Sequence, residues 1–439
     1  MDFIKSKLTG LLSGGLFGSG LLLFMSMTIV NGGNYLFNLI LGRWLGPAAF
    51  SDLSLIVTIM LMITFVTVTF QLTSAKFSAV ATADEDTQYL SNVRHWLNKM
   101  GWGLGLLLAF ILGAGSPFWQ SFFNTSSIWP FIILSVGFPI YFAQGVDRGI
   151  LQGNTKFGPL AVSYQAEMWV RLIIAILFVW IGWSVNGAVG GITLSFVATW
   201  LVARKAKINL PQPRPLSKKQ KRTIALFAGP VIIAHLSQIL INNSDILIVK
   251  RFFEAEEAGL YAALALIGRI VFFATWSVVT VLFPIVAQKH QKGEPHRHLL
   301  ALSLGLVAVV SGGILTFSYL FPDFIVNILF GEAYLSIAPL LWLYALATSV
   351  YALANVIITY RLSTGQGTGS WLAVFGGLTQ VIGLWLFHAT LRQVVVAQIY
   401  IMTTMLLILV IWDISLAWKE KRGTKQTVSE SVLVTQSGD

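Results

Sequence analysis

The sequence contains no cysteine and few charged residues. Its 439 residues include only 11% Asp, Glu, Lys and Arg, whereas soluble domains carry roughly 25% charged residues. Without cysteine, the chain forms neither a disulfide framework nor a thiolate metal site. Apolar side chains make up 56% of the chain. Because a single soluble core stops growing well before this length, the surplus apolar surface must face lipid.

The sequence also lacks the motifs of a catalytic or nucleotide-binding site. It shows no Ser/His/Asp constellation and no paired-carboxylate site, and the run GQG at 365–367 has no strand before it. His290, His296 and His298 share one polar loop without the spacing of a known metal site. We therefore predict a protein that is not an enzyme, binds no metal and uses no cofactor.

Long apolar runs make up most of what the sequence does contain. The first run follows Lys5 and Lys7 and continues to Leu41 without a cleavage motif, so it is predicted to be a retained helix. A membrane-spanning helix needs about 20 mostly apolar residues. Twelve segments qualify: 16–41, 50–74, 100–121, 128–146, 158–182, 185–202, 223–249, 258–284, 299–320, 334–359, 371–388 and 393–416. We predict an all-α polytopic membrane protein with twelve transmembrane helices.

The net charge of +11 follows membrane topology and does not indicate nucleic-acid binding. Of the 29 lysines and arginines, 23 fall in connections on the same side as both termini, four fall on the opposite side, and Arg171 and Arg269 fall inside spans. By the positive-inside rule, both termini are predicted to be cytoplasmic, which requires an even number of spans. The expected location is the inner (cytoplasmic) membrane, where juxtamembrane lysines face anionic lipid headgroups.

A basic, proline-rich stretch, RKAKINLPQPRPLSKKQKR, divides the chain near its middle. It is predicted to be an extended cytoplasmic linker. The predicted organisation is a six-helix N-terminal lobe, a linker, a six-helix C-terminal lobe and a disordered cytoplasmic tail, at residues 1–203, 204–222, 223–418 and 419–439.

The two predicted lobes are weakly similar to one another at an offset of 208 residues. This offset aligns Asn34 with Asn242 and Arg43 with Arg251. Because each lobe has an even number of spans, both lobes have the same orientation. They are expected to be related by an axis along the membrane normal, as in parallel-repeat transporters.

Polar residues inside the predicted spans are the candidate binding residues. A charge at the bilayer centre costs about 3 kcal/mol on insertion scales, so such residues usually face a polar cavity. Arg171 and Arg269 lie near the predicted midplane, one in each lobe. Their planar guanidinium groups suit a diphosphate, which they can bind bidentately. The alternative for Arg171 is a structural ion pair with Glu167, one turn earlier on the same helix.

Four further polar residues have two interpretations each. Glu167 is a candidate proton or sodium site, and Asp245 is a candidate gate or cation ligand. The alternative for Asp245 is helix packing with Lys250 or Arg251 as its partner. Asn34 and Asn242 are candidates for the cavity wall, although polar side chains also join helices to one another.

Two stretches resemble a known family. NYLFNLILGRWLGPAAFSDLSL (34–55) and NNSDILIVKRFFEAEEAGLYAAL (242–264) resemble the matching signatures of the polysaccharide-biosynthesis, or oligosaccharide flippase, family. This family lies in the multidrug/oligosaccharidyl-lipid/polysaccharide exporter superfamily, together with the multidrug and toxic-compound extrusion (MATE) transporters. The resemblance implies a MATE-like fold of two pseudo-symmetric six-helix bundles. It also implies alternating-access translocation of an undecaprenyl-diphosphate-linked oligosaccharide for O-antigen lipopolysaccharide, capsule or exopolysaccharide assembly.

Two other functions predict features that the sequence does not show. A multidrug/cation antiporter of the same fold predicts an acidic, aromatic-lined cavity, whereas two arginines accompany one glutamate near the predicted midplane. A membrane glycan polymerase or ligase predicts a large external loop, whereas the longest external connection here, 321–333, is short. The flippase is therefore the predicted function. Its expected partners are a lipid-linked oligosaccharide, membrane lipids and other polysaccharide-assembly proteins.

Overall fold

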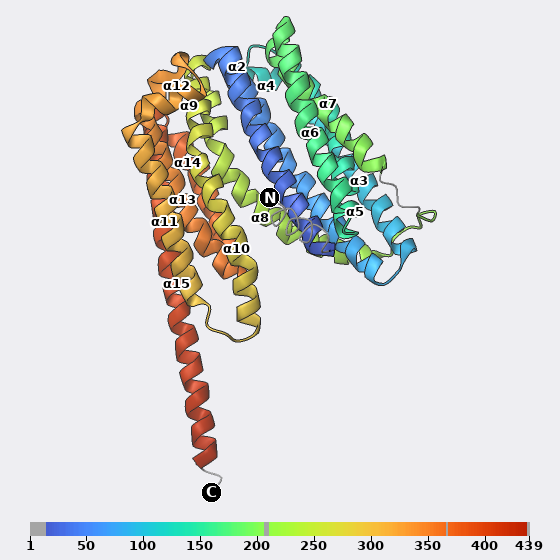
Figure 1. Ribbon diagram of the computed structural model, residues 1–439, viewed down its shortest axis with the longest axis vertical. Coiled ribbons are helices and arrows are strands. Elements are labelled where there is room, and N and C mark those ends of the chain that lie inside the picture. The colour runs from blue at the N-terminus through green and yellow to red at the C-terminus, as the bar shows by residue number, and fades with distance from the viewer. Residues whose placement is uncertain (1–14, 206–209, 366–367, 437–439) are drawn as a thin grey trace, which may run out of the picture. The chain divides into compact units, whose positions relative to one another are not determined.

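The computed structural model describes residues 15–205, 210–365 and 368–436, and these residues contain helices but no strand (Figure 1). In chain order the elements are α2 (Gly15–Ala83), α3 (Thr87–Ala114), α4 (Ser116–Phe123), α5 (Trp129–Gly153), α6 (Phe157–Phe178), the π-helix η1 (Val179–Trp183), α7 (Ser184–Lys205), α8 (Lys218–Phe252), α9 (Ala255–Gly268), α10 (Ile270–Gln291), α11 (Arg297–Leu320), α12 (Pro322–Leu329), the 3-10 helix η2 (Glu332–Leu340), α13 (Leu341–Ser363), α14 (Thr368–Leu386) and α15 (Leu391–Gln436).

Eight described helical segments are long and apolar enough to cross a membrane, or nine if the bent α8 is one span. Two of them, Leu22–Ala83 and Phe157–Lys205, contain 62 and 49 residues. At a rise of about 1.5 Å per residue, each far exceeds the roughly 30 Å of a bilayer core. Each is interrupted at a glycine with positive φ, Gly46 at 73° and Gly182 at 93°. The predicted all-α polytopic fold is confirmed, and the exact number of twelve spans stays a prediction.

The chain forms two compact units. Unit 1 contains the described residues up to Ile239, with Ile246–Ala263 and Val326–Ser336, and unit 2 contains Leu240–Asp245, Leu264–Ile325 and the described residues from Ile337 onward. Compactness does not measure the internal repeat, so the predicted division into lobes at 204–222 stays a prediction.

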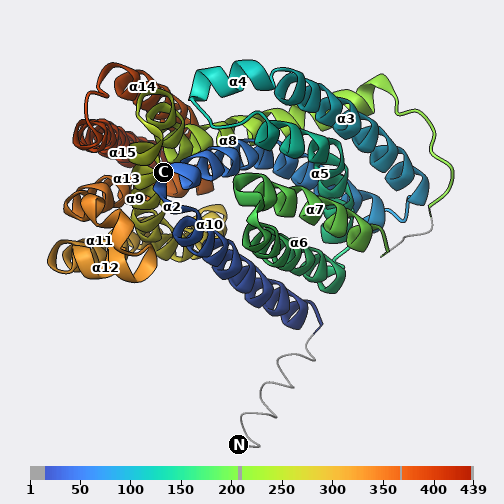
Figure 2. The same ribbon diagram turned by 90° about the horizontal axis from the view of Figure 1, so that it is seen from above.

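Helix α5 is the central helix of unit 1. It packs against α2, α3, α6 and α7, and Figure 2 shows it between α2, α3 and α7. Its buried residues lie on every face of the helix, which is the pattern of a helix surrounded by others. The helix begins at the dipeptide Trp129–Pro130, where proline lacks an N–H that would have had no intrahelical partner.

Glycines at every fourth position bring α5 into close contact with α2. A Cβ added at Gly145 would meet the carbonyl of Thr67, one at Gly149 that of Gln71, and one at Gly153 that of Ala75. Small residues at this spacing let two helix backbones approach closely within a membrane. The contact fixes where α5 presents the residues between these glycines, among them Arg148.

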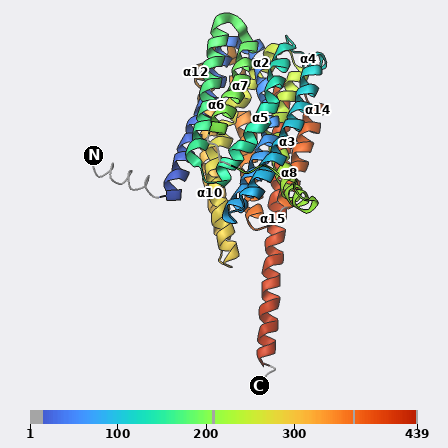
Figure 3. The ribbon, with the colours of Figure 1, turned by 90° about the vertical axis from the view of Figure 1, so that its right-hand side faces the viewer.

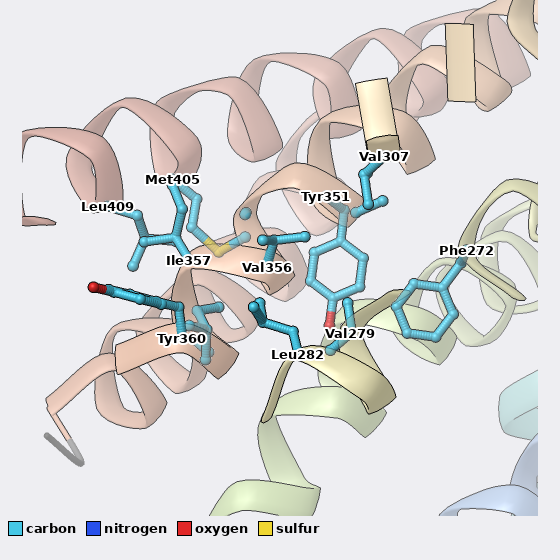
Figure 4. Packing of buried hydrophobic residues seen from close by; sticks show 14 of the residues in the cluster. Phe272, Val279, Leu282, Val307, Tyr351, Val356, Ile357, Tyr360, Met405 and Leu409 are labelled. Carbon is cyan, nitrogen blue, oxygen red and sulfur yellow. The ribbon is translucent and has the colours of Figure 1, made fainter. Parts of the chain in front are cut away.

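Helix α13 is the central helix of unit 2, where it packs against α10, α11, α14 and α15. Figure 4 shows the core around it, with the hydroxyl end of Tyr351 of α13 pointing toward Val279 and Leu282. The Tyr351 ring also stacks on Phe272, with ring centroids 5.4 Å apart. Each unit therefore buries one helix among several others.

The predicted linker is held against unit 1 over the residues that are described. Ser91 Oγ of α3 donates to the carbonyl of Pro211 at 2.6 Å, and Asn92 Oδ1 accepts from the Arg214 N–H at 2.6 Å. Leu216 is buried in a cluster with residues of α2, α3 and α5. Ser217 then caps α8 in a reciprocal pair with Gln220.

Helix α15 continues beyond its apolar part to Gln436 (Figure 3). The sequence predicts a disordered tail from residue 419, whereas residues 419–436 are helical in the structure. Propagating a helix needs only one hydrogen bond per added residue, and the Lys and Glu residues at 419–421 are good helix formers.

Replacing Gly149 with alanine is expected to destabilise unit 1. The added Cβ would lie 3.1 Å from the Ala75 nitrogen and closer still to the Gln71 carbonyl, so α5 and α2 must separate. Overpacking of this kind costs about 1–3 kcal/mol. Thermal unfolding in a mild detergent measures the effect. The control is Gly103→Ala, where the Cβ meets nothing within 4 Å and helix propensity predicts a gain of up to about 1 kcal/mol. Equal melting temperatures for the two variants would contradict close α2–α5 packing.

Candidate functional site

Unit 1 contains a buried carboxylate held between two arginines. Glu167 of α6 forms ion pairs with Arg171 one turn later, at 2.5 Å, and with Arg148 of α5, at 2.7 Å. The arginine side chains are 6% and 8% exposed and that of Glu167 is 13% exposed. Because water is largely excluded, these interactions are less screened than pairs at a surface. The cluster carries one more positive than negative charge.

The two arginines are held in different ways. Arg148 donates from Nε to Ser163 Oγ at 3.1 Å and from Nη2 to the Ser163 carbonyl at 3.0 Å, and its guanidinium lies 4.0 Å from the Tyr164 ring centroid. Apart from Glu167, the hydrogen-bond partner of Arg171 is Asn34 of α2, whose Oδ1 accepts from Nη1 at 3.2 Å. The Arg171 Nε has no hydrogen-bond partner among the described residues.

Further polar side chains surround this cluster. The Gln71 amide donates to Gln152 at 2.9 Å and to the Tyr164 hydroxyl at 2.8 Å. Gln144 lies one turn before Arg148 on α5, is fully buried, and neither polar atom of its side chain has a partner among the described residues. Buried polar groups without partners are rare in native proteins. Unit 1 therefore has unused hydrogen-bonding capacity next to an excess of positive charge.

Unit 2 places its predicted residues around Arg269, at the junction of α9 and α10. Arg269 Nη2 contacts Asp245 Oδ1 at 3.2 Å, and the Tyr344 hydroxyl donates to Asp245 Oδ2 at 2.7 Å. Asn242 and Arg269 line a small recess together with Tyr351 and Gln380. One carboxylate balances one guanidinium here, so this site carries no net charge.

The structure brings the predicted residues into two groups. Arg171, Glu167 and Asn34 lie together in unit 1, and Arg269, Asp245 and Asn242 lie together in unit 2. Each asparagine of the predicted repeat therefore lies beside the buried arginine of its own unit. The expected pair between Glu167 and Arg171 is present. The functional roles of these residues stay predictions.

The sequence-based assignment of a partner to Asp245 is corrected. Asp245 was predicted to pair with Lys250 or Arg251, but its partners are Arg269 and Tyr344. Lys250 instead contacts Asp52 of α2 at 2.7 Å and is 2% exposed. Asp245 lies on α8, and Arg269 lies 24 residues later, at the junction of α9 and α10. The periodicity of one helix does not indicate which residues of another helix it contacts.

Three cations assigned to connections by the sequence are buried within helices. They are Arg148, Lys250 and Arg361. Arg361 Nε bonds Asp413 of α15 at 2.6 Å, and Arg297 contacts the same carboxylate at 2.8 Å. The apolar runs that mark the spans end before Arg148 and Arg361, whereas the helices continue to Gly153 and Ser363. The apolar runs do not show how far each helix continues beyond them, and this is why the sequence assigns these cations to connections.

The unit 1 cluster has the chemistry of an anion site. An arginine fork can bind two oxygens of a phosphate in one plane, and the buried setting strengthens such a bond relative to water. Glu167 holds both guanidinium groups in place but neutralises only one of them. An anionic ligand that reached Arg171 would meet the unused Nε donor and the uncompensated charge.

Comparisons with known proteins identify a family and a fold. The sequence profile described as polysaccharide biosynthesis protein matches residues 17–290, which is more than half of the chain. A search of curated proteins gives no match.

Solved structures of similar fold include an inward-facing multidrug resistance MATE family transporter of the MOP superfamily. It has a TM-score of 0.78 at 15% identity and covers 88% of this chain and 95% of its own. An outward-facing structure of the same description has a TM-score of 0.64 at 16% identity, covering 94% and 98%. A MATE structure in a bent conformation has a TM-score of 0.63 at 16% identity, covering 95% and 99%. At these identities the likeness establishes the MATE-like fold, as the sequence predicts.

Neutralising Glu167 is expected to be far more damaging than neutralising Arg171. Glu167→Gln leaves Arg148 and Arg171 buried without a carboxylate, and removing one partner of a buried pair costs about 3–5 kcal/mol. Arg171→Gln leaves the pair of Glu167 and Arg148 intact. Thermal unfolding in detergent measures both.

The matched control for this prediction is Glu294→Gln. Glu294 pairs with Lys289 at 3.1 Å, but both side chains are substantially exposed, so a loss below about 1 kcal/mol is expected. If Glu167→Gln were as stable as Glu294→Gln, the carboxylate would not be holding the two arginines.

Proposed function

Because the chain belongs to the polysaccharide biosynthesis protein family, we propose that it is a flippase for an undecaprenyl-diphosphate-linked oligosaccharide. It moves this lipid-linked oligosaccharide across the inner (cytoplasmic) membrane by alternating access. The product serves assembly of a cell-surface polysaccharide, such as O-antigen lipopolysaccharide, capsule or exopolysaccharide. The family and the MATE-like fold support a membrane flippase or exporter.

The excess positive charge of the unit 1 cluster is the observation that carries the substrate proposal. Arg148 and Arg171 face a single carboxylate, and all three side chains are largely buried. A diphosphate supplies the missing negative charge and several acceptor oxygens. Its binding therefore offsets the cost of keeping an uncompensated guanidinium in apolar surroundings.

In this proposal Arg148 and Arg171 have different roles. Arg148 is held by Ser163, Tyr164 and Glu167, and it positions the carboxylate. Arg171 contacts the diphosphate through its Nε, a buried donor without a partner among the described residues, and Asn34 orients the guanidinium through its bond to Nη1. In unit 2, Arg269 and Asn242 line a recess of their own and are proposed as further substrate-binding residues.

Coupling to an ion gradient is a second part of the proposal. Glu167 and Asp245 are the buried carboxylates nearest the proposed binding residues. A proton or sodium ion that neutralised Glu167 would weaken its hold on Arg171 and leave that arginine to the diphosphate. Ion binding and substrate binding would then favour the same state of the site.

The rival function is multidrug or cation export, and two solved structures of this fold are described as multidrug resistance transporters. A cationic drug requires a surplus of negative charge in its cavity. The unit 1 cluster has a surplus of positive charge, and Asp245 in unit 2 is balanced by Arg269. These charges favour an anionic substrate.

Arg171→Gln is expected to reduce glycolipid translocation while leaving the protein folded. The change removes a charge-assisted hydrogen bond of about 1.5–3 kcal/mol, which corresponds to a loss of roughly tenfold to a hundredfold in affinity. The measurement follows a fluorescent polyprenyl-diphosphate oligosaccharide crossing the bilayer of proteoliposomes. Arg392→Gln is the control, because Arg392 is an exposed residue at the start of α15 that undergoes the same change in charge.

A fluorescent cationic drug serves as the second cargo. Glycolipid movement that falls in Arg171→Gln and persists in Arg392→Gln supports the proposal. Drug movement without glycolipid movement in the wild type would identify an exporter of cations instead. Unchanged glycolipid movement in Arg171→Gln would reduce the cluster to a structural role.

A further inference from the structure

Unit 1 contains a polar cavity that the proposed transport function does not use. The cavity measures about 540 Å³, within the range of small-molecule sites. It is lined by residues of α3, α5 and α7 and by described residues of the linker: Ser91, Arg94, His95, Asn98, Trp102, Asp147, Trp200, Arg204, Leu210, Pro211 and Pro213. The charge count predicts that this end of unit 1 faces the cytoplasm.

The cavity presents more positive than negative charge. Asp147, its one lining carboxylate, accepts from Nε and Nη2 of Arg94 at 3.2 and 2.8 Å. Arg204 forms no ion pair with a described residue, and its guanidinium lies 4.6 Å from the Trp200 ring centroid. The stacking restricts the guanidinium plane while leaving its N–H edges available as donors. His95 is an exposed third nitrogen donor.

The surroundings of the cavity favour a lipid over a soluble anion. Trp102 and Trp200 line it, and tryptophan is enriched at the level of the lipid headgroups. Along α3, Leu106 and Phe110 follow Trp102 on the same face and are 58% and 71% exposed. This apolar strip begins next to the polar cavity and can accommodate acyl chains. A headgroup site and a path for its tails therefore adjoin one another.

The linker completes the cavity wall. Pro211 and Pro213 line the cavity, and the carbonyls of Pro211 and Gln212 accept from Ser91 and Gln88 of α3. These bonds hold the wall without using the side chains of Arg204 or His95. The Arg204 and His95 side chains take no part in these wall bonds and are both exposed, so an external ligand can reach them.

We propose that this cavity binds the phosphate headgroup of an anionic phospholipid from the leaflet that the charge count assigns to the cytoplasm. Arg204 is the main contact and bonds the phosphate oxygens through its open edge. Arg94 adds its Nη1, which Asp147 does not engage. Basic pockets between transmembrane helices are suited to such headgroups, since the inner leaflet is rich in anionic lipid.

The test uses the full chain in nanodiscs of phosphatidylcholine with increasing phosphatidylglycerol. Native mass spectrometry counts retained phosphatidylglycerol for wild type, Arg204→Gln and the control Arg392→Gln. Loss of the Arg204 contact is expected to weaken phosphatidylglycerol retention by about tenfold or more, with no change for Arg392→Gln. Arg204 is exposed, and its charge acts on Asp147 without a direct ion pair among the described residues. The variant is therefore expected to fold as wild type, which its melting temperature checks.

Inorganic phosphate distinguishes a lipid from a soluble ligand. It is added at increasing concentration to the protein in a neutral detergent, with and without phosphatidylglycerol. Failure of phosphate to displace the lipid at about tenfold molar excess supports the lipid assignment. Displacement at equimolar phosphate would make the site one for a soluble anion and overturn the proposal, as would equal phosphatidylglycerol retention in Arg204→Gln and wild type.

Discussion

The cost of placing a charge among apolar helices is the constraint on which the interior of this protein depends. Each largely buried carboxylate of the described residues contacts at least one cation, as shown by Asp52, Asp147, Glu167, Asp245 and Asp413. Such a pair breaks at a cost of several kcal/mol, because the remaining partner stays buried without its counter-charge. Most of these pairs also join different helices. The ion pairs therefore limit the sliding and rotation of the helices that carry them, in addition to the packing around α5 and α13.

Two carboxylates have two arginines each, and the difference between them distinguishes a binding site from a structural one. Asp413 contacts Arg361 and Arg297, but the Arg297 side chain is 45% exposed and can be hydrated. Glu167 contacts Arg148 and Arg171, which are both less than a tenth exposed. Water can therefore offset the extra charge at Asp413 but not at Glu167. An anionic ligand that binds beside Glu167 would explain why a second guanidinium is kept there without its own counter-charge.

Hydropathy and local spacing predict the helices and one local ion pair but none of the ion pairs between helices. The apolar runs give the all-α membrane fold, with turns at Gly46 and Gly182, and the spacing of four gives the pair of Glu167 and Arg171. The partners of Asp245, Lys250 and Arg361 depend on which faces of distant helices meet. Hydropathy carries no such information, because it scores a residue by its neighbours along the chain and not by those in space.

The two arginines at Glu167 cannot both move when a ligand binds. Arg148 lies between Gly145 and Gly149, which press α5 against the backbone of α2, and its guanidinium is bonded to Ser163 as well as Glu167. Because close packing fixes the α5 backbone, only the side chain could move, and moving it would break three polar interactions together. Among the described residues, Arg171 is held by Glu167 and Asn34 alone, and its Nε has no hydrogen-bond partner. A ligand therefore competes with Glu167 for Arg171, while Arg148 keeps the carboxylate compensated throughout the exchange.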